Sequence, residues 1–318
     1  MDTILEIKEL EMSYRTIKGS VSAVDNVSFK IMKGESMGLV GESGCGKTSL
    51  GMCIMKLLPE NARITNGKIL FDGEDIVRKT EEEMRKIRWK GISMIFQAAM
   101  NALNPVYKVG DQIIEAIQTH DNISKEEARE KVEKLYELVG ISPERMENYP
   151  HEYSGGMRQR AIIAMALACD PKFIIADEPT TALDVIVQDQ IIDRIVNLQK
   201  KLNMTMMYIS HDISVIAETC NKIGVMYAGN IVEYAYTPTL FDNPLHPYTK
   251  ALMSSFPSIE GPKKELKPVP GEPPNLLNPP KGCRFYPRCS YAEERCKKEK
   301  PEFIEIEKDH FVACHEVI

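Results

Sequence analysis

One segment limits the possible folds of this chain more than any other. It runs from Gly41 to Thr48, reads Gly-Glu-Ser-Gly-Cys-Gly-Lys-Thr, and matches the pattern G-x-x-x-x-G-K-[ST]. It follows the apolar stretch Ser36 to Val40 and leads into a stretch of helical character, Thr48 to Leu58. This context predicts a buried strand, a phosphate-binding loop and a helix, which together are the core of a P-loop α/β protein.

The residue types of this loop suit a bound nucleoside triphosphate. Glycines allow backbone N–H groups to turn towards phosphate oxygens, while Lys47 can neutralise the β- and γ-phosphates and the Thr48 hydroxyl can bind Mg2+. A dinucleotide fingerprint fits less well, because Ser49 stands where that pattern needs a third glycine or an alanine. We expect the nucleotide to contact the loop and the residue after it, namely Gly41, Glu42, Ser43, Gly44, Cys45, Gly46, Lys47, Thr48 and Ser49.

Two other apolar stretches end in polar side chains. Phe173 to Asp177 and Met206 to Ser210 have the composition of buried parallel strands, and catalytic groups commonly lie just beyond such strand ends. Asp177 would hold Mg2+ through water, and Glu178 would point at an attacking water. His211 follows the second strand and could contact the γ-phosphate. The alternatives are a pair of acidic residues that only cap the next helix, and a structural histidine.

Charge and hydropathy exclude several classes of protein. The net charge of −6 disfavours a chain that mainly coats nucleic acid or an anionic membrane, so we expect no nucleic-acid partner. The longest apolar run, Ala161 to Cys169, is about half of the ~20 residues that a membrane-spanning helix needs, and predicts a buried helix. The first residues lack the pattern of a signal peptide. We therefore expect a cytosolic chain.

The order of the sequence patterns along the chain predicts three structural parts in addition to the P-loop core. Leu5 to Leu10, Val27 to Ile31 and Gly67 to Asp72 read as strands of an antiparallel sheet near the N-terminus. Apolar residues from Val106 to Tyr149 recur at helical spacing, which predicts a mostly helical insert. After Thr237 frequent prolines disfavour long regular elements. The predicted fold is an α/β P-loop core with an antiparallel β subdomain, an inserted α-helical subdomain and a loop-rich C-terminal extension.

A further motif accompanies the phosphate loop and the two polar strand ends. Tyr153 to Arg160 reads Tyr-Ser-Gly-Gly-Met-Arg-Gln-Arg and opens the apolar helix Ala161 to Ala168. Together with the phosphate loop and the two strand ends, it resembles the signature motif of the ABC ATPases. Tyr153 and Met157 differ from the residues commonest at those positions, and we interpret both as marks of a subfamily. The resemblance implies a dimer with ATP held between two chains.

The resemblance assigns roles to residues that carry no strong pattern of their own. Tyr14 would stack on adenine, and Asp184 would be the D-loop aspartate. Gln97 would contact Mg2+ or the attacking water and sense a membrane-spanning partner. The signature residues that close on the ATP of the opposite subunit would be Ser154, Gly155 and Gly156. The expected catalytic residues are Glu178 as the general base, His211 as the switch histidine, Gln97 and Lys47. The expected Mg2+ ligands are Thr48, Gln97 and Asp177.

Two C-terminal segments make the resemblance more specific. Asn243 to Leu252 and Gly282 to Cys289 resemble the ATPase subunits of dipeptide and oligopeptide importers. This implies an ATPase bound to the cytoplasmic face of the cell membrane. Its partners would be transmembrane permease subunits, a second ATPase that is homologous or identical, and, indirectly, an extracytoplasmic peptide-binding protein. Importers of nickel or sugars are close alternatives, and a soluble ABC ATPase of DNA repair or translation is a more distant one.

Four of the eight cysteines gather near the C-terminus. Cys283, Cys289, Cys296 and Cys314 have the spacing C-x5-C-x6-C-x17-C in a segment with few apolar residues, so a metal centre could supply folding free energy. Four thiolates suit a [4Fe-4S] cluster or tetrahedral Zn2+. The resemblance favours the iron–sulfur cluster, with Zn2+ and free or disulfide-linked thiols as the alternatives. We expect an ATPase domain over residues 1–255, with its helical subdomain at about 98–160, and a cluster-bearing extension over 256–318.

Overall fold

The computed structural model describes residues 2–97, 102–180, 184–254 and 269–317. The chain divides into two compact units. Unit 1 comprises Met1–Ile4, Met32–Glu35 and Arg78–Tyr208. Unit 2 comprises Leu5–Ile31, Ser36–Val77 and Ile209–Ile318. The predicted boundary between residues 255 and 256 lies outside the described residues and stays a prediction.

The N-terminal sheet of unit 2 has four strands in the order β2-β1-β4-β5. β1 (Thr3–Thr16) pairs antiparallel with β4 (Ala62–Phe71), and β4 pairs antiparallel with β5 (Glu74–Asp75). β2 spans Gly19–Met32. Apolar residues alternate along β1 and β2 because one face of this sheet is covered and the other is not. This confirms the antiparallel subdomain expected from the alternation.

The second group of strands in unit 2 has the order β11-β12-β10-β9-β3. β3 (Ser36–Val40) and β9 (Lys222–Tyr227) are parallel and fully buried, whereas β9 and β10 (Asn230–Tyr236) are antiparallel. The remaining strands are β11 (Ile304–Glu307) and β12 (His310–Val312). β12 pairs with β10, so the C-terminal extension adds a hairpin to this group of strands. The sequence did not predict this hairpin.

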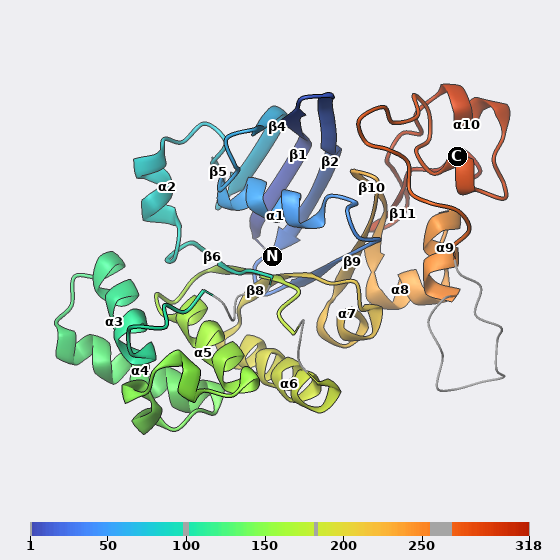
Figure 1. The fold of residues 1–318 in the computed structure, drawn as a ribbon. Helices are drawn as coiled ribbons and strands as arrows, with labels where there is room; N and C mark the ends of the chain where they lie inside the picture. The colour runs from blue at the N-terminus through green and yellow to red at the C-terminus, as the bar shows by residue number, and fades with distance from the viewer. Residues whose placement is uncertain (1, 98–101, 181–183, 255–268, 318) are drawn as a thin grey trace. The chain divides into compact units, whose positions relative to one another are not determined.

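Short helices accompany the strands of unit 2 (Figure 1). They are α1 (Lys47–Met55), α7 (Ile213–Thr219), α8 (Thr237–Asp242), α9 (Pro247–Ser254) and α10 (Glu294–Lys298). α1 is shorter than the predicted helix because Lys56 takes a left-handed conformation with φ 50° and ends it. α8 and α9 both carry a proline in the first turn, where a missing N–H costs nothing. The prolines after Thr237 therefore limit helix length without preventing helices.

Unit 1 combines buried strands with a group of helices (Figure 1). β6 (Ile92–Ile95) is parallel to β7 (Phe173–Asp177), which is followed in the sheet by β8 (Thr205–Ile209). The other elements are α2 (Glu81–Ile87), α3 (Val109–His120), α4 (Lys125–Val139), α5 (Gly155–Leu167) and α6 (Val185–Leu202). α3, α4 and α5 pack together, as the helical periodicity of this region predicts.

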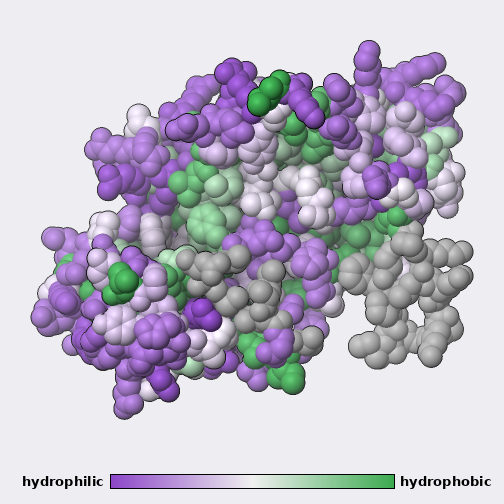
Figure 2. Space-filling model, in the orientation of Figure 1, coloured by the Kyte–Doolittle hydropathy of each residue, from purple (hydrophilic) through white to green (hydrophobic). Residues whose placement is uncertain are grey.

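The predicted fold class is confirmed in its main parts. Parallel buried strands with helices form the α/β core, and the antiparallel sheet and the helical group are both present. No helix within the described part of the chain is long and apolar enough to cross a membrane. Side chains on the face shown in Figure 2 are mainly hydrophilic, with groups of hydrophobic side chains among them.

Candidate functional site

The phosphate loop of unit 2 joins β3 to α1, as predicted. Gly41, Gly44 and Gly46 have φ values of 152°, 77° and 110°, in the region that glycine adopts most easily. A Cβ at Gly41 would lie 2.0 Å from the Met226 carbonyl oxygen, and one at Gly46 would lie 2.1 Å from the Ala23 carbonyl oxygen. Glycine is therefore required at both positions. Nothing lies within 4 Å of a Cβ position at Gly44, where the loop is open.

Lys47 is the cation of this loop. It is only 7% exposed, and its Nζ donates to the carbonyl oxygens of Gly41 at 2.6 Å and Glu42 at 3.1 Å. Thr48, the next residue, is exposed at the start of α1. A buried ammonium group, an open glycine turn and an exposed hydroxyl at a helix N-terminus fit a polyphosphate with Mg2+.

The Tyr14 hydroxyl, on β1, lies 3.0 Å from the Ser49 hydroxyl, so the tyrosine expected to stack on adenine lies beside the first turn of α1. The helix N-terminus near Cys45 would favour a lowered thiol pKa. Burial instead raises the pKa of Cys45 and outweighs the neighbouring Lys47 ammonium. Cys45 is a small packing residue of the loop.

In unit 1 the ends of β6 and β7 bring two predicted residues together. Gln97 Nε2 donates to Glu178 Oε2 at 2.7 Å, although the two residues are far apart in the sequence. Glu178 has a φ of 47°, which is unfavourable for a residue with a side chain and commonly marks a functional position. Asp177 is 1% exposed at the end of β7. The arrangement can hold a water molecule or Mg2+ close to a carboxylate base.

The signature residues of unit 1 face a hollow between two helix N-termini. Ser154 caps α5 by accepting from Met157 N at 3.3 Å, and Asp184 caps α6 by accepting from Val187 N at 3.0 Å. The hollow is lined by Ser154, Gly155, Gly156, Met157, Arg160, Asp184 and Val187. Two helix N-termini and an arginine favour an anion at this place.

The structure groups the predicted residues within each unit. Unit 1 joins Gln97 to Glu178 and brings Ser154, Gly155 and Gly156 to Asp184. Unit 2 holds the phosphate loop, Tyr14 and the exposed His211, which follows β8. That Gln97 and Glu178 act on the nucleotide of the phosphate loop stays a prediction, and so does the action of the signature residues on the ATP of an opposite subunit. Arg160 and Val187 were missed, although Arg160 lies within the signature motif itself.

The prediction of an iron–sulfur cluster is wrong, and so is its zinc alternative. Among the described residues, which include all four cysteines, no group of three or more His, Cys, Asp or Glu side chains is arranged to hold a metal ion. Cys283, Cys289, Cys296 and Cys314 are free. Burial raises the pKa of the Cys283 thiol to about 11.

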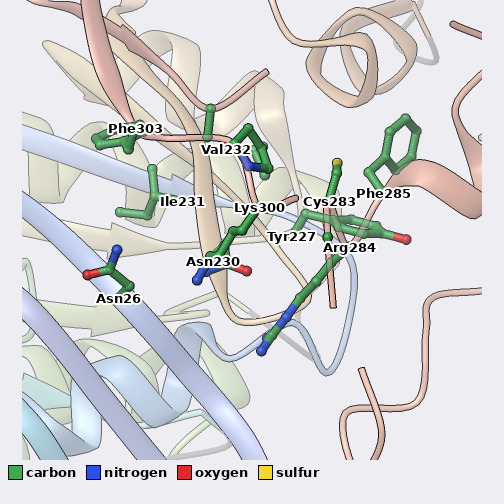
Figure 3. Close-up of a pocket in the computed structure, with 13 residues that line it drawn as sticks. Asn26, Tyr227, Asn230, Ile231, Val232, Cys283, Arg284, Phe285, Lys300 and Phe303 are labelled. Atoms are coloured by element: carbon green, nitrogen blue, oxygen red, sulfur yellow. The ribbon is translucent and has the colours of Figure 1, made fainter. Parts of the chain in front are cut away.

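Packing and ion pairs stabilise the extension where a metal was expected. Phe285 packs against Tyr227 and Tyr248, with ring centroids 5.1 Å and 5.4 Å away. Arg284 forms an ion pair with Asp25 at 2.6 Å. Figure 3 shows Arg284, Phe285 and Tyr227 among the residues that line a small pocket beside β10. The folding free energy attributed to a metal centre therefore has another source.

Comparisons with known proteins agree with this arrangement. Residues 24–181 match the family model described as ABC transporter, and residues 232–296 match the model described as oligopeptide/dipeptide transporter, C-terminal region. The dipeptide transport ATP-binding protein DppD of Caldanaerobacter subterraneus is 44% identical over 99% of this chain and 97% of its own length. The oligopeptide transport ATP-binding protein OppD of Bacillus subtilis is 47% identical over 97% of this chain and 87% of its own length.

A solved structure of lower identity shows the same core. It is a dimeric, post-hydrolysis ATP-binding cassette bound to ADP and Pi, with a TM-score of 0.66 and 26% identity. It covers 73% of this chain and 98% of its own chain.

Proposed function

The chain belongs to the ABC transporter family, among the ATP-binding proteins of dipeptide and oligopeptide transport, and on this premise we propose that it binds ATP with Mg2+ and hydrolyses it to power peptide import. The observation that carries the proposal is the contact between Gln97 and Glu178 at the ends of two parallel strands. It supports a carboxylate base whose position is controlled by a residue of a neighbouring strand.

Each group of residues has a distinct role in the proposed reaction. The phosphate loop and Lys47 bind and neutralise the triphosphate, while Thr48, Asp177 and Gln97 are the candidate positions for Mg2+. Glu178 accepts a proton from the attacking water, and His211 orients the γ-phosphate. When Mg2+ is bound, it neutralises charge on the phosphates.

The proposed partners follow from the family. A second ATPase subunit, identical or homologous, would place its signature residues against the ATP of this chain, and the dimeric cassette supports such an arrangement. Transmembrane permease subunits would receive the motion of closure and hydrolysis, so the chain would lie on the cytoplasmic face of the membrane. An extracytoplasmic peptide-binding protein would deliver the solute.

Replacing Glu178 tests the proposed chemistry. We expect Glu178→Gln to lower the rate of ATP hydrolysis by at least about 100-fold while ATP binding is retained, because the amide cannot accept the proton. Phosphate release and binding of a fluorescent ATP analogue measure the two effects. Glu130→Gln, an exposed change on α4, is the matched control and should leave both unchanged.

Two outcomes would contradict this proposal in different ways. If Glu178→Gln hydrolyses ATP at the wild-type rate, Glu178 is not the base. If the wild-type chain binds no ATP, or if Lys47→Ala binds it as tightly as the wild type, the phosphate loop does not have the role proposed for it.

A further inference from the structure

The phosphate loop contains an acidic residue, which is unexpected in a site for a polyphosphate. Glu42 directly follows Gly41, and its side chain is 24% exposed. A carboxylate beside bound phosphates repels them, and the repulsion is stronger where water is partly excluded. A loop with this residue binds phosphate well only if another group neutralises the carboxylate.

Arg288, in the C-terminal extension, supplies the neutralising charge. Its Nη1 donates to Glu42 Oε2 at 2.8 Å and its Nη2 donates to Glu42 Oε1 at 3.0 Å, which is a bidentate ion pair. The arginine side chain is only 5% exposed. Its pKa is raised, because hydrogen bonds to Glu42 and Tyr227 outweigh the burial that disfavours its charge. The guanidinium stays charged.

Other contacts fix both partners in place. Arg288 Nε donates to the Pro270 carbonyl oxygen at 2.6 Å, and Nη1 donates to the Tyr227 hydroxyl at 3.3 Å. The backbone N–H of Glu42 donates to the Tyr248 hydroxyl at 3.0 Å. Tyr248, on α9, is fully buried. The side chain and the backbone of Glu42 are thus both held by residues of the C-terminal region.

We propose that the C-terminal extension forms part of the nucleotide site, with Arg288 as a positioning residue that neutralises Glu42 and holds the phosphate loop in its binding conformation. This rests on the proposed function, since it concerns ATP affinity. Loss of the ion pair would weaken ATP binding without removing any group that touches the nucleotide. Undocking of the extension would then lower the affinity of this chain for ATP.

The test measures the affinity for MgATP and the hydrolysis rate of the purified full-length chain. We expect Arg288→Ala to raise the Kd for ATP about tenfold, which is the size of a charge-assisted pair, while kcat at saturating ATP changes less than about twofold. Adding Glu42→Gln to Arg288→Ala should restore most of the affinity, because the amide carries no charge to repel phosphate. Arg288→Lys should lie between the wild type and Arg288→Ala.

Controls separate positioning from a general loss of structure. Lys300→Ala removes a positive charge of the same extension, one that pairs with Asp25 at 2.9 Å, and should leave the Kd for ATP unchanged. Thermal unfolding reports the stability of every variant, and Arg288→Gln replaces Arg288→Ala if the alanine variant does not fold.

The other possible results contradict either the role of Arg288 or the proposed function. An unchanged Kd in the Arg288 variants, or a raised Kd that Glu42→Gln does not restore, overturns the role of Arg288. Equal losses in Arg288→Ala and Lys300→Ala also overturn it. Failure of the wild-type chain to bind ATP overturns the proposed function instead.

Discussion

His246 is a residue whose surroundings make protein stability depend on pH. It is fully buried, its Nδ1 accepts from the Tyr248 backbone N–H at 3.0 Å, and burial lowers its pKa to about 3. In the unfolded chain its pKa returns to about 6.5. Between these values the unfolded state binds a proton that the native state does not, so the free energy of unfolding falls as the pH falls.

We expect protonation of His246 in the unfolded chain to lower the free energy of unfolding by about 2 kcal/mol when the pH falls from 7 to 5. Urea unfolding at both pH values measures it. His246→Asn keeps an acceptor for the Tyr248 N–H and cannot be protonated, so its stability should change less over this range. Equal pH dependence in the two proteins would show that other groups are responsible.

Individual site residues were predictable where a short motif contains them. The phosphate loop needs glycine and lysine at fixed spacing, so Gly41, Gly46 and Lys47 could be found without a structure. Arg288 could not, because its partner lies 246 positions earlier and neither residue has a distinctive sequence pattern. The four cysteines misled the prediction for a related reason. Their spacing suggested ligands, whereas ligation depends on three-dimensional placement that spacing does not determine.

At the scale of elements, two helices of unit 1 begin with matched serine caps. Ser154 accepts from Met157 N at the start of α5, and Ser124 accepts from Glu127 N at 3.1 Å at the start of α4. We expect alanine at either position to lower the free energy of unfolding by about 1 kcal/mol. Only Ser154→Ala should also lower ATP hydrolysis, by about tenfold or more, because Ser154 lines the hollow beside Asp184.

Urea unfolding and phosphate release on the two variants check this prediction. Equal activity in both would show that Ser154 is only a cap, and equal loss of activity would show that cap loss alone impairs catalysis.

The elements with clear periodicity or continuous apolar runs could be predicted, and the misses have physical reasons. β7 is short, apolar at its first four positions and buried at all five. Its composition was therefore sufficient to predict a buried strand. β11 and β12 were missed because their residues are few and partly exposed. They become strands through pairing with each other and through pairing of β12 with β10. α1 ended early because Lys56 adopts a left-handed conformation that propensity does not reveal.

Residues near the C-terminus extend a sheet and make a buried side-chain contact with β10. His310 Nε2 lies 2.8 Å from Glu233 Oε1, and neither side chain is exposed by more than 1%. Glu233 also accepts from the backbone N–H groups of Leu245 and His246. Removal of residues 299–318 would leave this carboxylate without His310 and uncover the edge of β10.

We expect this truncation to lower the free energy of unfolding by about 1–3 kcal/mol and to cause aggregation, because a buried polar group loses its hydrogen-bond partner and a strand edge becomes available for pairing. Urea unfolding and size-exclusion chromatography measure both effects. Lys308→Ala, in the turn between β11 and β12, is the control and should behave as the wild type. A truncated chain as stable as the wild type would contradict the prediction.

The pairing of Glu42 with Arg288 also has a consequence for synthesis of the chain. The ribosome completes the phosphate loop early, but Arg288 follows Glu42 by 246 positions. At about 5–20 residues per second, roughly 12 to 50 s pass between the two. During that time the nascent loop carries an unneutralised carboxylate. If the extension completes the site as proposed, tight ATP binding begins only after Arg288 has been translated, and products that terminate before Arg288 compete poorly for ATP.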